Sequence, residues 1–103
     1  MDENDKLAEI ENYLKTLSPG CIVENTWDSE TRRYIFKINA PAGEIKHVIG
    51  ITAEFISDNT PGDIVFSLKL YNLKGYLEIF RNKEVLVTND GVNPDGKRPL
   101  IIK

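Results

Sequence analysis

The sequence contains one cysteine, Cys21, and one histidine, His47, which are the only possible thiol nucleophile and imidazole base. A thiolate nucleophile needs a base within hydrogen-bonding reach and a third group that orients this base. Cys21 lies in an apolar run beside Ile22 and Val23, and a free cysteine in such a run is typically buried. We therefore interpret Cys21 as a core thiol and His47 as a surface or edge residue.

Metal and cofactor sites are also poorly supported by the sequence. A structural zinc site needs about four cysteine, histidine or carboxylate ligands, and this chain has one cysteine and one histidine. Residues 93–96 resemble part of a calcium loop, but Gly91 and Ile102 occupy two positions where such a loop has acidic residues. Glycine-rich phosphate-binding motifs are absent, and the carboxylates are scattered. We expect no metal, no cofactor and no catalytic residue, and we predict that the protein is not an enzyme.

Aromatic residues at predicted solvent-facing strand positions indicate a protein-binding surface. The period of two in residues 64–71 and 76–81 directs one apolar set inward, namely Phe66, Leu68, Leu70, Leu77 and Ile79. The same alternation directs Tyr71, Tyr76 and Phe80 outward. Aromatic side chains are enriched at protein interfaces, so we predict a partner-binding surface formed by Tyr71, Tyr76, Phe80 and Trp27.

Two alternative functions remain open from the sequence. The basic residues Arg32, Arg33 and Lys37 lie near Trp27 and Tyr34, as in surfaces that stack and steer single-stranded nucleic acid. The net charge of −3 disfavours this alternative, because nucleic-acid binding depends on positive charge. The other alternative is a carrier that holds a small apolar ligand between a helix and a sheet.

The elements that must position these residues follow from hydrophobic periodicity. In residues 2–17, Leu7, Ile10, Leu14 and Leu17 form a helical stripe, and Ser18-Pro19-Gly20 ends the helix. Residues 21–27 and 32–39 are predicted strands. Residues 44–57 fit either a strand or a helix, with more signals for a strand. Residues 63–88 are predicted to form three antiparallel strands joined by short turns, because parallel neighbours need a long crossover. Residues 89–99 are predicted to form a loop and residues 100–102 a short final strand.

These elements predict a single α+β domain over residues 1–103. An N-terminal amphipathic helix packs on a five- to six-stranded antiparallel meander sheet, so that both amphipathic elements are covered. In outline this architecture resembles cystatin-like arrangements. The alternative places a second helix at residues 44–57, in the order α-β-β-α-β-β-β, and resembles small chaperone-like domains.

Composition narrows the class of protein. The apolar fraction of 41% and the charged fraction of 28% are ordinary for a soluble globular chain, and no apolar run reaches the length of a membrane span. The acidic N-terminus disfavours a secretory signal, and the single cysteine favours a reducing compartment. We expect a cytoplasmic, non-enzymatic binding or accessory protein that acts through protein–protein contact. Edge strands at Glu84–Thr88 or Leu100–Ile102 predict a homodimer formed by strand pairing.

Overall fold

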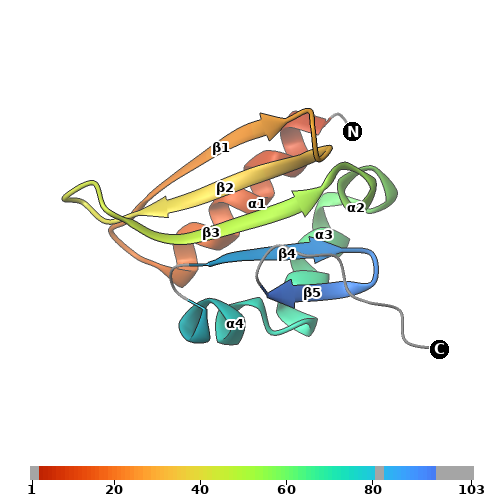
Figure 1. Ribbon diagram of the computed structural model, residues 1–103. Coiled ribbons are helices and arrows are strands. Elements are labelled where there is room, and N and C mark those ends of the chain that lie inside the picture. Colours follow the sequence, from red (N-terminus) through yellow and green to blue (C-terminus); the bar gives the residue numbers. More distant parts are fainter. Residues whose placement is uncertain (1–2, 81–82, 95–103) are drawn as a thin grey trace.

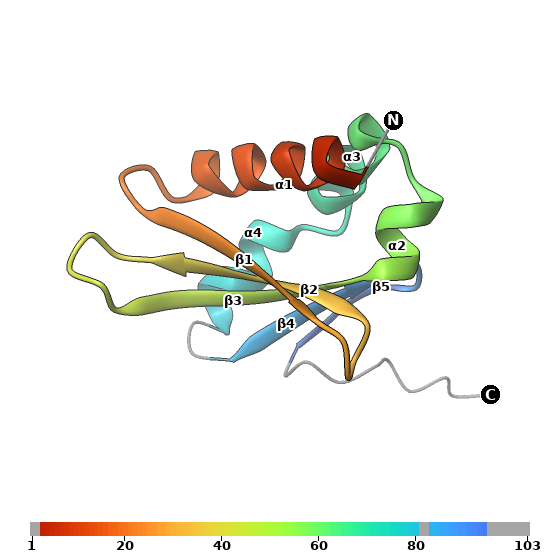
Figure 2. The ribbon, with the colours of Figure 1, turned by 90° about the horizontal axis from the view of Figure 1, so that it is seen from above.

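The computed structural model describes residues 3–80 and 83–94, which form a five-stranded sheet with all of the helices on one face (Figures 1 and 2). The elements in chain order are α1 (Glu3–Leu17), β1 (Ile22–Asp28), β2 (Arg33–Asn39), β3 (Ile45–Thr52), α2 (Ala53–Asp58), α3 (Pro61–Leu70), α4 (Leu73–Ile79), β4 (Glu84–Thr88) and β5 (Gly91–Pro94). The α+β fold and the N-terminal helix packed on the sheet are confirmed.

The strand order in the sheet follows the chain, from β1 to β5. Pairs β1–β2, β2–β3 and β4–β5 are antiparallel, whereas β3 and β4 are parallel. A parallel pair needs a long crossover, and the chain supplies one in the segment that contains α2, α3 and α4. The sheet is therefore mixed but mostly antiparallel. Because β4 lies between β3 and β5, the prediction that Glu84–Thr88 is a sheet edge is wrong. The predicted strand at Leu100–Ile102 lies outside the described residues.

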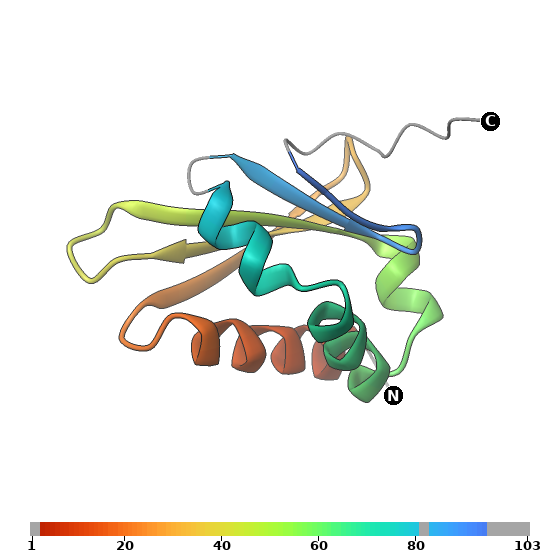
Figure 3. The same ribbon diagram turned by 90° about the horizontal axis from the view of Figure 1, so that it is seen from below.

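The hydrophobic core lies between the helices and one face of the sheet (Figure 3). The α1 stripe contributes Ile10 and Leu14, both fully buried, so the predicted inner face of this helix is confirmed. On the sheet face that packs against the helices, alternate residues of the three central strands are fully buried: Phe36, Ile38, Ile49, Ile51, Val85 and Val87. The strand predicted at residues 32–39 is confirmed as β2, and Phe36 and Ile38 lie on its buried face.

The prediction that residues 63–81 form two strands of a meander is wrong, because residues 61–70 and 73–79 are helical. The start of α3 shows why a helix forms there. The side-chain oxygen of Thr60 accepts a hydrogen bond from the backbone N–H of Asp63 at 3.2 Å, and Pro61 occupies the first turn. A threonine cap and an early proline both favour a helix start. Ile64 and Leu68, four residues apart, then point into the core.

Residues 45–58 combine the two structures that the sequence left open for this segment. The strand β3 ends at Thr52, whose side-chain oxygen accepts a hydrogen bond from the Phe55 N–H at 3.2 Å and caps α2. The segment therefore contains a strand followed by a short helix. The predicted loop at 89–99 contains one further strand, β5, which follows a turn at Asn89 and Asp90 and begins at Gly91, whose φ is 122°.

Candidate protein-binding surface

Helix α3 is apolar on two sides. Pro61, Ile64 and Leu68 are buried against the core, while Phe66 and Leu70 are 64% and 68% exposed. Phe66 and Leu70 are four residues apart, so both side chains lie on the same face of the helix. A surface helix usually turns a polar face to water, so this second apolar face is unusual. The sequence analysis placed Phe66 and Leu70 in the core, and this prediction is wrong because a helix directs them away from Leu68.

A groove of about 250 Å³ runs between α1 and α3 on the outer side of the helical layer. It is lined by Glu9, Asn12, Tyr13, Thr16, Val65 and Lys69. The Lys69 ammonium lies 5.9 Å from the centre of the Tyr13 ring, and burial raises the pKa of the Tyr13 phenol. Val65 and Lys69 each precede a residue of the exposed pair directly in sequence. The groove and the Phe66/Leu70 face are therefore adjoining parts of the surface of α3.

The four aromatic residues predicted to bind a partner lie on two different parts of the fold. Tyr71 caps the C-terminus of α3 with its ring 6.5 Å from that of Phe55, while Tyr76 and Phe80 stack at 6.3 Å along α4. All three are half-buried and pack on the core from the helical layer, rather than from the outer face of a meander. Trp27 lies on β1. The role of these residues in binding stays a prediction.

Trp27 is held in place by its neighbours. It is 45% exposed, and its ring centre lies 4.7 Å from that of Tyr34. The Tyr34 hydroxyl donates a hydrogen bond to the Glu3 carboxylate of α1. Burial, followed by this hydrogen bond and by the charge of Glu3, raises the pKa of Tyr34 to about 12. The Tyr34 ring thus supports the indole ring at the edge of the sheet.

The basic residues of the nucleic-acid alternative do not form a row of unopposed positive charges. Arg33 forms an ion pair with Glu84 at 3.0 Å, and its side chain is 15% exposed. Lys37 lies directly opposite Glu24 in the β1–β2 register. Arg32 belongs to the turn before β2 and has a φ of 53°. Since carboxylates accompany two of the three cations, the geometry adds no support to this alternative.

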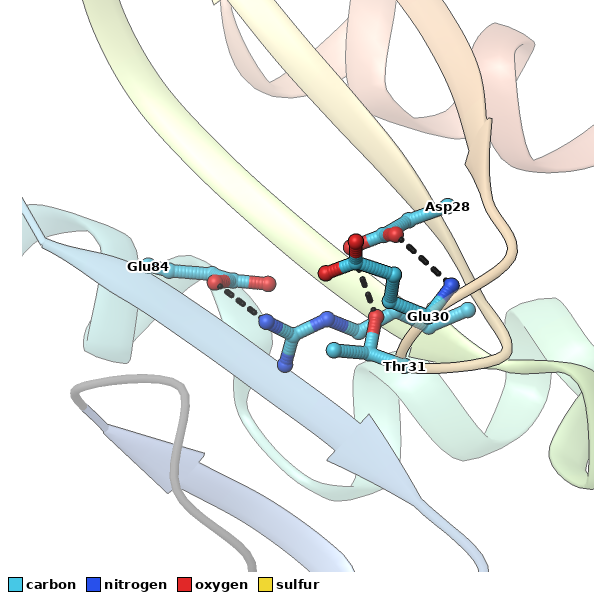
Figure 4. Close-up of polar contacts among 5 residues, drawn as sticks. Asp28, Glu30, Thr31 and Glu84 are labelled. Carbon is cyan, nitrogen blue, oxygen red and sulfur yellow. Dashed lines mark hydrogen bonds and ion pairs between the residues drawn. The ribbon is translucent and has the colours of Figure 1, made fainter.

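The Arg33–Glu84 ion pair lies on the sheet face opposite the helices and crosses strand β3 (Figure 4). It passes over Gly50, where a Cβ atom would lie 2.2 Å from Glu84 Oε2. Asp28, directly opposite Arg33 in the register, accepts hydrogen bonds from the Thr31 hydroxyl at 2.8 Å and the Glu30 N–H at 3.1 Å. The Thr31 bond is the main reason that the pKa of Asp28 is lowered. The Arg33–Glu84 pair thus links β2 to β4 across β3, and we assign it a structural role.

Burial raises the pKa of Glu84 above its ordinary value of 4.5, although the positive charge of Arg33 opposes the shift. A carboxyl group with a raised pKa in the folded protein stabilises the fold fully below its unfolded pKa, and this stabilisation is lost as the pH rises through the folded pKa. We therefore expect the free energy of unfolding of the wild type, relative to Glu84→Gln, to fall as the pH rises above 4.5. Urea titrations of both proteins at a series of pH values measure this difference. A difference that is constant or rises over this range would contradict the raised pKa.

The carrier alternative requires space between α1 and the sheet. That region is occupied by fully buried, mutually packed side chains, including Ile10, Leu14, Phe36 and Ile38, and the groove described above lies on the outer side of α1 instead. In the described part of the chain, no three cysteine, histidine or carboxylate side chains come together where they could hold a metal ion. Within residues 3–80 and 83–94, every helix is too short or too polar to cross a bilayer.

Comparison of the chain with protein-family models, with curated proteins and with solved structures finds no match.

Proposed function

We propose that the protein is a non-enzymatic accessory protein that binds another protein through the outer side of its helical layer. The observation that carries this proposal is the exposure of Phe66 and Leu70 on one face of α3, opposite a face that is already buried. Exposed apolar clusters commonly mark sites of protein contact. The adjoining groove offers a partner an aromatic contact through the Tyr13 ring and polar contacts through the charged groups of Glu9 and Lys69 beside it.

The proposal places the protein in the cytoplasm, in keeping with the free thiol of Cys21. Cys21 is half-buried and packs against the core. We further propose that Tyr71, Tyr76 and Phe80 support the Phe66/Leu70 face, because they are half-buried and pack against the core within the same helical layer.

The double variant Phe66→Asp/Leu70→Asp tests the proposed surface. We expect it to weaken binding of the protein partner by at least about tenfold, because truncating a hot-spot residue near the centre of an interface costs about 2 kcal/mol or more. Its free energy of unfolding should stay close to that of the wild type, since both side chains are exposed. The immobilised wild type is used to isolate a partner from source cells. The purified partner is then titrated by calorimetry against the wild type and against the double variant.

Ser57→Asp is the control, because Ser57 is exposed on α2 and the substitution introduces an aspartate elsewhere in the helical layer, with one of the two negative charges that the double variant adds. This control should bind the partner as the wild type does. If the double variant and the control bind with equal affinity, the partner does not use α3 and the proposal is wrong.

A further inference from the structure

The first strand of the sheet, β1, has an outer edge that no other strand in residues 3–80 and 83–94 pairs with. It is an end strand of the sheet, seven residues long, and five of its residues are exposed: Ile22, Glu24, Asn25, Thr26 and Trp27. Natural proteins protect such edges with lysine, proline, bulges or short strands. β1 contains no lysine or proline, and its register with β2 is unbroken from Ile22 to Asp28. The other edge strand, β5, has four residues and ends in Pro94, which lacks an N–H donor.

We infer that β1 pairs with β1 of a second copy of this chain, in an antiparallel register centred on Asn25. This surface lies on the sheet edge, so it is independent of the proposed surface on α3. A two-fold axis perpendicular to the sheet would join the two sheets edge to edge, with the helices of both copies on the same face. Such an interface is isologous, so the same strand must be complementary to itself.

The charges of β1 select this register. Side chains directly opposite each other must lie on the same face, so a symmetric pairing that retains most of the strand is centred on Glu24, Asn25 or Thr26. A centre at Glu24 places two copies of that carboxylate opposite each other. A centre at Thr26 places Glu24 opposite Asp28 of the second copy, twice. Only the centre at Asn25 places no two carboxylates directly opposite each other and also pairs all seven residues of the strand.

The same register pairs the exposed Trp27 with the half-buried Val23. On the face that carries the helices, Trp27 would lie opposite Val23 of the second copy, and this contact occurs twice by symmetry. Pairs of an aromatic and a β-branched side chain are among the favourable cross-strand contacts. The Tyr34 ring already contacts one side of the indole, which reduces the side-chain freedom that Trp27 would lose on pairing. On the opposite face, Glu24 would lie opposite the Thr26 hydroxyl of the second copy.

The residues around the proposed axis are compatible with close approach. The Asn25 amide donates a hydrogen bond to Glu11 of α1 at 3.2 Å, so Glu11 faces the β1 edge. Ala8 and Lys15 lie three and four residues from Glu11 and therefore share its side of α1. This side of the helix thus carries one small residue and charges of both signs. Two copies that approach each other here would therefore not face each other with charges of one sign only.

Substitutions of opposite charge at Thr26 test the inference. Thr26 is exposed on β1 and would lie opposite Glu24 of the second copy. We expect Thr26→Lys to tighten the dimer and Thr26→Glu to weaken it, each by about two- to thirtyfold, because two symmetric cross-strand pairs change together. Sedimentation equilibrium from micromolar to millimolar protein gives the dissociation constants. A wild type that remains monomeric, or two variants that shift the constant in the same direction or not at all, would overturn the inference.

Disulfide trapping tests the register separately. In a Cys21→Ser background, Asn25→Cys should form an intermolecular disulfide under mild oxidation, because residues on the axis have Cα atoms within bonding range. Glu24→Cys and Thr26→Cys are the matched controls and should cross-link much more slowly. Faster cross-linking of either control than of Asn25→Cys would overturn the Asn25-centred register. The double variant at Phe66 and Leu70 should dimerise as the wild type does, so failure of the dimer and failure of the proposed function are distinguishable.

Discussion

Replacing Leu14 with alanine is expected to lower the free energy of unfolding by about 2–5 kcal/mol, the range for buried leucines. Leu14 is fully buried in the middle of the inward stripe of α1 and belongs to the core cluster. A helix of this length is only marginally stable alone, so its contact with the sheet must hold it in place. Urea unfolding followed by circular dichroism measures the change.

Lys15→Ala is the control for this prediction, because Lys15 is the exposed neighbour of Leu14 on the same helix. Its effect should stay within about 0.5 kcal/mol, as is usual for surface substitutions. If Leu14→Ala destabilises the protein no more than this control does, α1 does not dock on the sheet through its inward stripe.

Replacing Gly50 with alanine is expected to lower the free energy of unfolding by about 1–3 kcal/mol, the usual cost of overpacking. The added Cβ atom would lie 2.2 Å from Glu84 Oε2 and 3.2 Å from Arg33 Cδ. The Glu84 side chain would therefore have to move away from β3, and the 3.0 Å ion pair with Arg33 would be lost or lengthened. The cost arises from this displacement, because alanine itself is a better strand residue than glycine.

A double-mutant cycle with Glu84→Ala isolates that cause. Without the Glu84 carboxylate, the nearest obstacle to a Cβ atom at position 50 is removed. In this background Gly50→Ala should be neutral or should stabilise the protein by about 0.5–1 kcal/mol, the ordinary advantage of alanine over glycine. An equal loss of stability in both backgrounds would show that the ion pair does not explain why glycine occupies this position.

In the elements that the sequence predicted correctly, the apolar residues follow a single repeat, either that of a helix or that of a strand. In α1, Ile10 and Leu14 match only a helical repeat, and in β2, Phe36 and Ile38 alternate with polar or half-buried neighbours. Residues 64–70 carry two overlapping patterns. Phe66, Leu68 and Leu70 alternate as in a strand, while Ile64 and Leu68 are spaced as in a helix. The cap formed by Thr60 and Pro61 is the local signal that favours the helix over the strand.

The same ambiguity between strand and helix explains why the sequence did not predict the exposed apolar face of α3. A strand directs Phe66 and Leu70 to the same face as Leu68, whereas a helix directs them to a different side, so one error of period moved both from the surface to the predicted core. The exposure of Ile79, 73% in the structure, was missed for the same reason. The Arg33–Glu84 pair joins residues 51 positions apart in the sequence, and no local pattern predicts such a contact.

The parallel pairing of β3 with β4 has a consequence for the order in which the protein folds. Strands β1, β2 and β3 are joined by short turns, so they can pair with little loss of chain entropy. β4 joins β3 only after the chain from Ala53 to Lys83 has been brought back across the sheet, which makes these contacts the more distant ones along the chain. Contacts of larger sequence separation slow folding. We therefore expect the β1–β3 meander to be protected from hydrogen exchange earlier in refolding than β4 and β5.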